Sequence, residues 1–204
     1  MIVKNDNKES LYNTSNIILA TGARPKIIKG LEHDNKHIWS YKDAMIPEKK
    51  PESLLVIGAG AIGIEFASFY NDFGSEVTVI ESQNEILPSE DLEVSLFAKK
   101  CFEQDKIKIL TSTTMKNVKS TKFGVEAEFI DKNGEKHKLK YSRAIVAIGI
   151  DANIENLGLD TVNIKQDGGM ILTDNNNETS EKGIFAIGDL TGAPWLAHKA
   201  SHEG

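Results

Sequence analysis

Cysteine is almost missing from this sequence. Cys101 is the single cysteine among 204 residues, so no internal disulfide framework can form. There is also no run of about 18 or more apolar residues, which predicts that no segment crosses a membrane. The first residues lack the basic and apolar regions of a secretory signal peptide. These absences favour a reducing, cytoplasmic setting, in which Cys101 is predicted to be a small core thiol.

An excess of positive charge is missing too. The formal net charge is −6, which argues against a general attraction to nucleic acid. The lysine-rich stretches are short and mixed with acids, and the one at residues 132–136 predicts a hairpin turn. The five histidines and one cysteine show no metal-ligand spacing, and no GxSxG nucleophile motif is present. The sequence therefore predicts neither a metal site nor a catalytic nucleophile.

Short apolar runs recur along the chain and stop at glycine or polar residues, which is typical of buried parallel strands. These runs are residues 16–20, 54–57, 77–80, 107–110, 143–148 and 183–187. Ile62, Phe66, Phe69 and Phe73 lie at spacings that put them on one face of a helix of roughly 12 residues. A second helix is predicted over residues 90–104, with Ser89 as its N-cap.

The remaining segments have other patterns. Residues 113–119, 124–130 and 136–140 predict an antiparallel β-meander, and residues 24–50 predict a connector with one helical turn near 42–45. Residues 151–182 are polar with scattered apolar positions. The alternation of strands and helices predicts a doubly wound α/β layer with a parallel sheet.

The strongest motif for chemistry is Gly58-Ala59-Gly60-Ala61-Ile62-Gly63, which lies between a predicted strand and a predicted helix. Gly58 permits a tight turn, Gly60 lets the backbone approach a pyrophosphate, and Gly63 lets the helix pack on the sheet. Free N–H groups and the helix dipole then meet the negative phosphates. The alternative is a glycine-rich turn that binds nothing.

Glu81 favours the first of these interpretations. It ends the second predicted strand, 18 positions after Gly63, where an acid accepts hydrogen bonds from the ribose of an adenosine. A 2′-phosphate there would face a like charge, and residues 82–84 contain no arginine. NAD is therefore favoured over NADP. The alternative is a solvated carboxylate at a strand end.

Four other residues each have two interpretations. Glu65 is either a surface acid suited to a helix N-terminus or a functional group. Asp189 follows a strand and either caps a turn or holds a sugar-like hydroxyl group. Gly149 either lets a ligand approach or turns the chain, and His198 is more often structural than catalytic.

The order of the motifs resembles that of the two-dinucleotide flavoprotein disulfide reductases. Ala20-Thr21-Gly22-Ala23-Arg24-Pro25 comes first, and the NAD glycines, Glu81, Ala147-Ile148-Gly149, Gly183 to Asp189 and Ala193 to Ala200 follow. The last of these segments is most similar to the dihydrolipoamide dehydrogenase branch of that family.

This resemblance implies a Rossmann-like FAD/NAD(P)-binding fold with an antiparallel β-meander, plus remnants of the FAD domain. Residues 1–25 would be the FAD-domain remnant and crossing strand, 26–150 the NAD-binding domain, and 151–204 the return segment and second part of the FAD-binding domain. NAD would lie on the glycine motif and Glu81, with Met115 and Gly149 lining its nicotinamide half. Further residues match the family near FAD, namely Thr21, Gly22, Asp189, Ala197 and, reaching toward the flavin, Glu65.

The resemblance also implies a function for a full-length parent. Such an enzyme reoxidises dihydrolipoyl groups of 2-oxo acid dehydrogenase complexes with NAD, using bound FAD, and its partners are a dihydrolipoyl domain and a second copy of itself. The family's FAD fingerprint, its cysteine pair and its catalytic histidine are absent from this sequence. We therefore expect an inactive fragment with no catalytic residue of its own.

Two departures and two alternatives remain. Ile150-Asp151-Ala152-Asn153 stands where the family usually has an arginine and a proline, and Trp195 stands where methionine is common. The first alternative is a stand-alone nucleotide-binding module. The second is a fragment of a mercuric or glutathione reductase-like protein, although Glu81 argues against the NADPH-dependent members.

Overall fold

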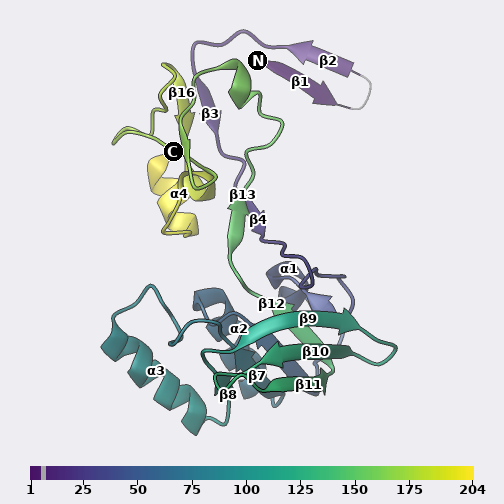
Figure 1. Ribbon diagram of the computed structural model, residues 1–204. Helices are drawn as coiled ribbons and strands as arrows, with labels where there is room; N and C mark the ends of the chain where they lie inside the picture. Colours follow the sequence, from purple (N-terminus) through teal and green to yellow (C-terminus); the bar gives the residue numbers. More distant parts are fainter. Residues whose placement is uncertain (6–7) are drawn as a thin grey trace. The chain divides into compact units, whose positions relative to one another are not determined.

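The protein consists of two compact units in a computed structural model that describes residues 1–5 and 8–204 (Figure 1). Unit 1 combines Met1–Arg24 with Ile150–Gly204, and unit 2 is Pro25–Gly149. None of the helices in the described residues has the length and apolar character needed to cross a membrane.

Unit 2 is built on a five-stranded parallel sheet with the order β5-β12-β6-β7-β8. The strands are β5 (Ile38–Trp39), β6 (Ser53–Ile57), β7 (Glu76–Ile80), β8 (Lys108–Leu110) and β12 (Arg143–Val146). The chain moves outward from β6 through β7 to β8 and later returns to β12 on the other side of β6. This arrangement confirms the predicted α/β layer, and its strand order reverses beside β6, where such folds bind ligands.

Both faces of this sheet are covered. Neighbouring side chains of a strand point to opposite faces, and each set packs in a cluster of its own. Leu54 and Val56 of β6 pack in one cluster with Ala67 and Tyr70 of α2 (Ala61–Asp72). Leu55 and Ile57 pack in a second cluster with residues of the β-meander. This double burial explains why the strands have continuous apolar runs.

The helices depart from the sequence prediction in detail. The buried residues of α2 are Gly63, Ile64, Ala67 and Tyr70, whereas Phe69 and Phe73 of the predicted apolar row are 49% and 62% exposed. Within the row Ile62, Phe66, Phe69 and Phe73, Phe66 packs against the core cluster, whereas Phe69 and Phe73 lie outside the face that packs on the sheet. That face combines the small residues Gly63 and Ala67 with Ile64 and Tyr70, and the glycine lets the start of the helix lie against the backbone of Gly58.

Two further predictions in this region need correction. Helix α3 (Leu92–Gln104) begins after Asp91, not Ser89, because Asp91 is the residue whose backbone stays outside the helical region (φ −58°, ψ 141°). Cys101 on α3 is only partly buried and does not belong to the core clusters. The short helix α1 (Tyr41–Met45) confirms the predicted helical turn.

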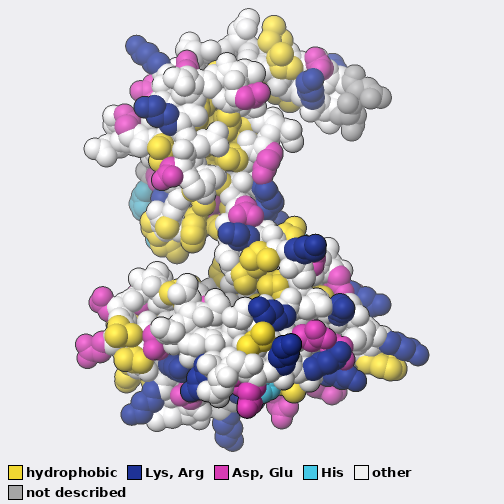
Figure 2. Space-filling view, viewed as in Figure 1, with side chains coloured by type: hydrophobic (Ala, Val, Ile, Leu, Met, Phe, Trp, Pro, Cys, Tyr) yellow, Lys and Arg dark blue, Asp and Glu magenta, His cyan; other side chains and the backbone are white. Residues whose placement is uncertain are grey.

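The predicted meander is present as β9 (Thr114–Ser120), β10 (Val125–Ile130) and β11 (Lys136–Tyr141), all antiparallel. Alternate residues Val125, Ala127 and Phe129 face the core. On the outer face, Lys138 pairs with both Glu126 and Glu128. Charges of both signs are mixed on this side of unit 2, as Figure 2 shows, so the meander has no uniform basic surface.

Unit 1 contains a parallel pair, β3 (Ile17–Leu19) with β16 (Ile184–Ala186). Its core is a cluster formed by Ala152, Ile164, Ile171, Ala186 and Leu190. The other elements are the hairpin β1 (Ile2–Asn5) and β2 (Lys8–Leu11), the pairs β4 (Ala23–Pro25) with β13 (Ile150–Ala152) and β14 (Gln166–Asp167) with β15 (Met170–Ile171), the 3₁₀ turns η1 (Leu159–Thr161) and η2 (Gly188–Thr191), and helix α4 (Ala197–Glu203).

Candidate functional site

Two glycines of the motif are required by close backbone contacts. Gly58 has a φ of +100°, and a Cβ atom there would lie 2.3 Å from the carbonyl oxygen of Ala147. A Cβ atom at Gly63 would lie 2.0 Å from the carbonyl oxygen of Gly58. Gly60 differs from both, since a Cβ atom there would meet nothing within 4 Å. Gly58 and Gly63 therefore serve the fold, whereas Gly60 borders open space.

Helix α2 begins at this open space with Gly60 as its N-cap. The N–H of Ile64 donates to the Gly60 carbonyl at 3.0 Å, which is the first bond of the helix. The N–H groups before it have no partner within the helix, as at every helix N-terminus. Ala61 is exposed and Ile62 is half-buried at this end. The helix start therefore offers donors and a positive dipole end to an anion.

The Glu81 carboxylate lies against the same loop. One oxygen, Oε2, accepts the N–H of Ala59 at 2.7 Å. The other, Oε1, accepts the N–H of Gln83 at 2.8 Å and the hydroxyl of Ser82 at 3.1 Å. Glu81 is 8% exposed, and these three donors hold its carboxylate against the glycine turn.

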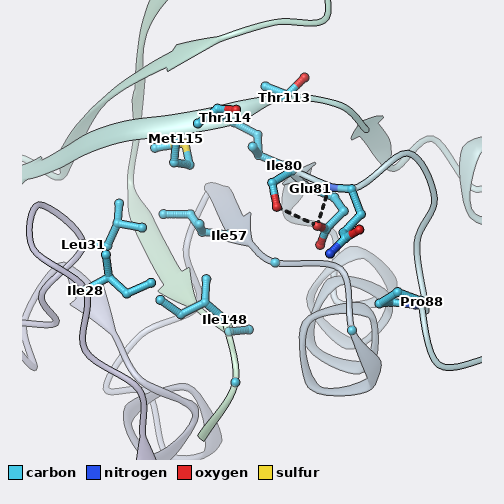
Figure 3. Close-up of a pocket in the computed structure, with 16 residues that line it drawn as sticks. Ile28, Leu31, Ile57, Ile80, Glu81, Pro88, Thr113, Thr114, Met115 and Ile148 are labelled. Carbon is cyan, nitrogen blue, oxygen red and sulfur yellow. Dashed lines mark hydrogen bonds between the residues drawn. The ribbon is translucent and has the colours of Figure 1, made fainter.

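A cavity of about 450 Å³ lies next to these groups. Figure 3 shows Glu81 at one end of the cavity and the aliphatic side chains of Ile28, Leu31 and Ile148 at the other. A cavity of this size falls in the range of small-molecule sites, which run from about 300 to 1,000 Å³. The full lining is Ile28, Leu31, Ile57, Gly58, Gly60, Ile80, Glu81, Ser82, Gln83, Pro88, Thr113, Thr114, Met115, Ala147, Ile148 and Gly149.

The structure brings half of the residues that the sequence suggested for NAD to the lining of this cavity. Those that line the cavity are Gly58, Gly60, Glu81, Met115 and Gly149. Of the other motif residues, Ala59 contacts Glu81 through its N–H, and Ala61, Ile62 and Gly63 begin α2 without lining the cavity. Glu65 is exposed on α2, outside the lining.

Several lining residues were missed by the sequence analysis. Ser82 and Gln83 follow Glu81 directly, so their place at the strand end was a usable signal. Thr113 is 2% exposed, and Ile28 and Leu31 come from the segment predicted as a connector. No local pattern indicates that these last residues reach the cavity, because the tertiary fold brings them there.

A second group of candidate residues lies in unit 1, after the carboxyl ends of β3 and β16. Thr21 and Gly22 follow β3, and Asp189 follows β16 within η2. The carboxylate of Asp189 accepts no hydrogen bond from any of the described residues. A Cβ atom at Gly22 would meet nothing within 4 Å. Ala197 begins α4. A half-buried carboxylate without a protein donor suits a ligand hydroxyl group.

The segment that departs from the family pattern has its own bonding. Asn153 donates its side-chain N–H to the carbonyl of Thr21 at 2.9 Å and accepts the Thr21 hydroxyl on its own carbonyl at 2.6 Å. Arg24 donates to the Ala152 carbonyl at 3.2 Å and pairs with Glu155. The hydroxyl of Thr21 is therefore already bonded within the protein.

One cluster of possible metal ligands was not predicted. Asp131, Glu135 and His137 at the β10–β11 turn place ligand atoms within 4.8 Å of one another. Asp131 already accepts the N–H groups of Asn133 and Glu135 and contacts the His137 ring at 2.8 Å. These bonds account for the cluster as part of the hairpin turn.

Comparisons with known proteins agree with this geometry. The family model described as pyridine nucleotide-disulphide oxidoreductase matches residues 1–204. The dihydrolipoyl dehydrogenase of Zymomonas mobilis is 47% identical over 204 residues, which is all of this chain and 44% of that protein. The enzyme of Bacillus subtilis with the same name is 38% identical and is covered to 42%. The chain thus spans less than half the length of these relatives.

Solved structures show the same fold. LpdA from Mycobacterium tuberculosis superposes with a TM-score of 0.86 at 30% identity, over 97% of this chain and 42% of that one. The flavoprotein disulfide reductase RclA from Escherichia coli superposes with a TM-score of 0.86 at 20% identity, over 99% of this chain and 45% of that one. At this identity the second likeness shows the fold alone.

Proposed function

Because the chain belongs to the pyridine nucleotide-disulphide oxidoreductase family, we propose that unit 2 binds NAD as part of a flavin-linked dihydrolipoamide dehydrogenase. The main observation in support is the Glu81 carboxylate, which accepts the N–H of Ala59 at 2.7 Å. It lies beside the N-terminus of α2 and lines a cavity of about 450 Å³. The relatives from Zymomonas mobilis and Bacillus subtilis are named dihydrolipoyl dehydrogenase, which favours this function over a mercuric or glutathione reductase-like one.

The residues fit NAD along the length of the cavity. The diphosphate lies against the α2 N-terminus at Gly60, whose missing side chain leaves open space. Glu81 takes the adenosine ribose, because its carboxylate is an acceptor for two adjacent hydroxyl groups. Met115 and Gly149 line the nicotinamide half with Ile148. NAD supplies a hydride acceptor when bound, and the chain supplies binding and orientation.

Charge sets the preference for NAD over NADP. A 2′-phosphate on the ribose would lie next to the Glu81 carboxylate, which is only 8% exposed and so is poorly screened by water. The neighbouring Ser82, Gln83 and Asn84 carry no positive charge to compensate. The phosphate would therefore be desolvated against a like charge, which costs binding free energy.

Unit 1 belongs to the FAD site in the same proposal. The Asp189 carboxylate would accept a hydrogen bond from a hydroxyl group of the FAD ribityl chain. Near the cofactor would lie Thr21, Gly22 and Ala197. The resemblance to the family also implies that Glu65 of α2 reaches toward the flavin. Unit 1 thus corresponds to parts of an FAD domain and unit 2 to the inserted NAD domain.

The proposed activity of the whole enzyme is cytoplasmic reoxidation of dihydrolipoyl groups of 2-oxo acid dehydrogenase complexes. Its partners are a dihydrolipoyl domain and a second copy of the enzyme. With Cys101 as its single cysteine, the 204-residue chain cannot form a redox disulfide within itself. We therefore expect no dehydrogenase activity from these 204 residues alone.

Titration of the chain with NADH and NADPH, followed by nucleotide fluorescence, tests the proposed function. We expect NADH to bind at least about tenfold more tightly, which corresponds to about 1.4 kcal/mol. Glu81→Gln keeps the shape of the side chain and removes its charge, so the preference should shrink to within a few-fold. Glu93→Gln, an exposed acid on α3 outside the cavity, is the matched control and should behave like the wild type.

Two outcomes contradict the proposal. Equal affinity for NADH and NADPH in the wild type would remove the role of Glu81 in selecting the ribose. No binding of either nucleotide by a folded chain would remove the NAD site altogether.

A further inference from the structure

Two side chains of helix α4 hydrogen-bond to the peptide groups on both sides of Gly188. The Glu203 carboxylate accepts the Gly188 N–H on Oε2 at 2.7 Å. The Lys199 ammonium donates to the Gly188 carbonyl at 3.2 Å and to the Thr191 hydroxyl at 2.9 Å. Lys199 Nζ and Glu203 Oε1 also contact each other at 2.9 Å, one helical turn apart. We call these two side chains the α4 clamp.

The clamp is the least exposed ion pair in the described part of the chain. The side chains of Lys199 and Glu203 are 17% and 19% exposed, and every other ion pair there has at least one side chain more exposed. Burial alone would raise the pKa of Glu203, but the Gly188 N–H and the Lys199 ammonium outweigh it and lower that pKa. The carboxylate is therefore ionised at neutral pH, with its donors in place.

An ion pair of this kind is a poor way to gain stability alone. Desolvation of two charges offsets most of their attraction, and an apolar pair of similar size would stabilise a helix contact as well. A fully bonded polar network, however, fixes geometry more sharply than apolar packing does. The clamp bonds both the N–H and the C=O of one residue, so what it fixes is the backbone at Gly188.

The residue next to this fixed backbone is Asp189. The Gly188 carbonyl held by Lys199 belongs to the peptide unit that leads into Asp189. Gly188 itself has a φ of +78°, and a Cβ atom there would lie 3.2 Å from Ala200 Cβ of α4. The helix thus packs closely on this backbone, while the Asp189 carboxylate stays free of donors from the described residues.

We propose that Lys199 and Glu203 are positioning residues, which hold the η2 backbone so that the Asp189 carboxylate is aimed at a hydroxyl group of a bound flavin dinucleotide. The inference about the ligand rests on the proposed FAD site. The inference about the backbone does not, because it follows from the contacts of the clamp alone.

Amide hydrogen exchange of the 204-residue chain without any cofactor tests the backbone part. In Glu203→Gln and Lys199→Met, we expect the amides of residues 188–192 to exchange roughly ten- to a hundredfold faster, as expected for loss of a charged hydrogen bond. Exchange in β3 and β16 should stay unchanged. His202→Gln changes an exposed residue of the same helix and is the matched control. Unchanged exchange at residues 188–192 in both clamp variants would overturn the proposal.

Flavin binding tests the ligand part in the protein expressed from its full reading frame. We expect Glu203→Gln and Asp189→Asn each to weaken FAD binding about tenfold or more in fluorescence titrations. The double variant should bind FAD no more weakly than Asp189→Asn alone, because the clamp acts through Asp189. A merely structural role of α4 predicts additive losses instead.

The outcomes separate the two levels of inference. Additive losses, or an unchanged FAD affinity in Glu203→Gln with faster exchange at residues 188–192, would overturn the positioning of Asp189 for flavin while leaving the FAD site itself. A wild-type protein that binds no FAD would defeat the proposed FAD site. The exchange measurement would then still decide whether the clamp holds the η2 backbone.

Discussion

At the scale of single residues, the glycine motif separates into positions that serve the fold and one that borders open space. Gly63 is held by the approach of α2 to the strand, since a Cβ atom there would lie 2.0 Å from the Gly58 carbonyl oxygen. Gly60 has no neighbour within 4 Å of the same atom and borders the cavity. The contacts agree with the roles that the motif predicted for Gly58 and Gly63 in the fold, and the pyrophosphate role of Gly60 stays a prediction.

This difference gives a paired test. We expect Gly63→Ala to lower the free energy of unfolding by about 1–3 kcal/mol or more, because the new methyl group overpacks a backbone contact. Gly60→Ala should cost less than about 1 kcal/mol, since it changes only an N-cap. It should nevertheless weaken NADH binding at least about tenfold, because its methyl group projects into the space of the diphosphate.

Urea unfolding and NADH titration of both variants are the measurements. The two variants are controls for each other, because neither Gly60 nor Gly63 has a positive φ and only the position of the new methyl group differs. A Gly60→Ala chain that binds NADH like the wild type would show that the diphosphate does not lie at this residue.

At the scale of elements, the sequence predicted those that bury a periodic apolar pattern. The strands β6 and β7 have continuous apolar runs because both faces are covered, and β10 alternates because only one face is. The exposed aromatic residues Phe69 and Phe73 were misleading, since the packing face of α2 is formed by Gly63, Ile64, Ala67 and Tyr70. Periodicity reports where apolar residues lie on a helix but not which side the sheet takes.

Short elements and the distant parts of the site could not be predicted in this way. Two-residue strands such as β5 and β14 are defined by their partners and have no period of their own. The glycine turn and Glu81 could be predicted because they adjoin in sequence the strands that carry them. The α4 clamp was missed, although the spacing of Lys199 and Glu203 was a usable signal of an ion pair on one helix face.

The turn before β5 gives a pH-dependent expectation at this scale. Asp34 Oδ1 accepts the N–H groups of Lys36, His37 and Ile38 at 2.8–2.9 Å. Burial would raise the pKa of Asp34, but these donors outweigh it and lower that pKa from 3.8 to about 2. Because the folded pKa is the lower one, the stabilisation is present above about pH 4 and is lost as pH falls to about 2.

The variant Asp34→Asn checks this expectation. Since Asp34 is exposed, solvent screens the interaction, and we expect the variant to be less stable by only about 1 kcal/mol at pH 7. The difference from the wild type should disappear by about pH 2 in urea unfolding followed across pH. Asp72→Asn, an exposed acid at the end of α2, should show no such pH-dependent difference. A constant difference for Asp34→Asn down to pH 2 would rule out the carboxylate as its source.

At the scale of the whole molecule, each unit has a core of its own. Unit 2 buries two apolar clusters on the two faces of its parallel sheet, and unit 1 buries a smaller cluster around Ile171 and Leu190. The cavity beside Glu81, where we propose that NAD binds, is lined by residues of unit 2. Compact parts with separate cores can open separately, and a ligand stabilises the part that binds it.

NADH should therefore protect one unit and leave the other unchanged. At a free concentration of 100 times its Kd, it stabilises the binding-competent fold by about 2.7 kcal/mol. We expect the amides of β6 and β7 to exchange about a hundredfold more slowly under native conditions, and those of β3 and β16 to exchange at the rate of the free protein. Gly60→Ala at the same NADH concentration is the control, and its β6 amides should gain less protection. Equal protection of both units by NADH would mean that the molecule unfolds as one cooperative body, and the separate cores would then not define separate units of stability.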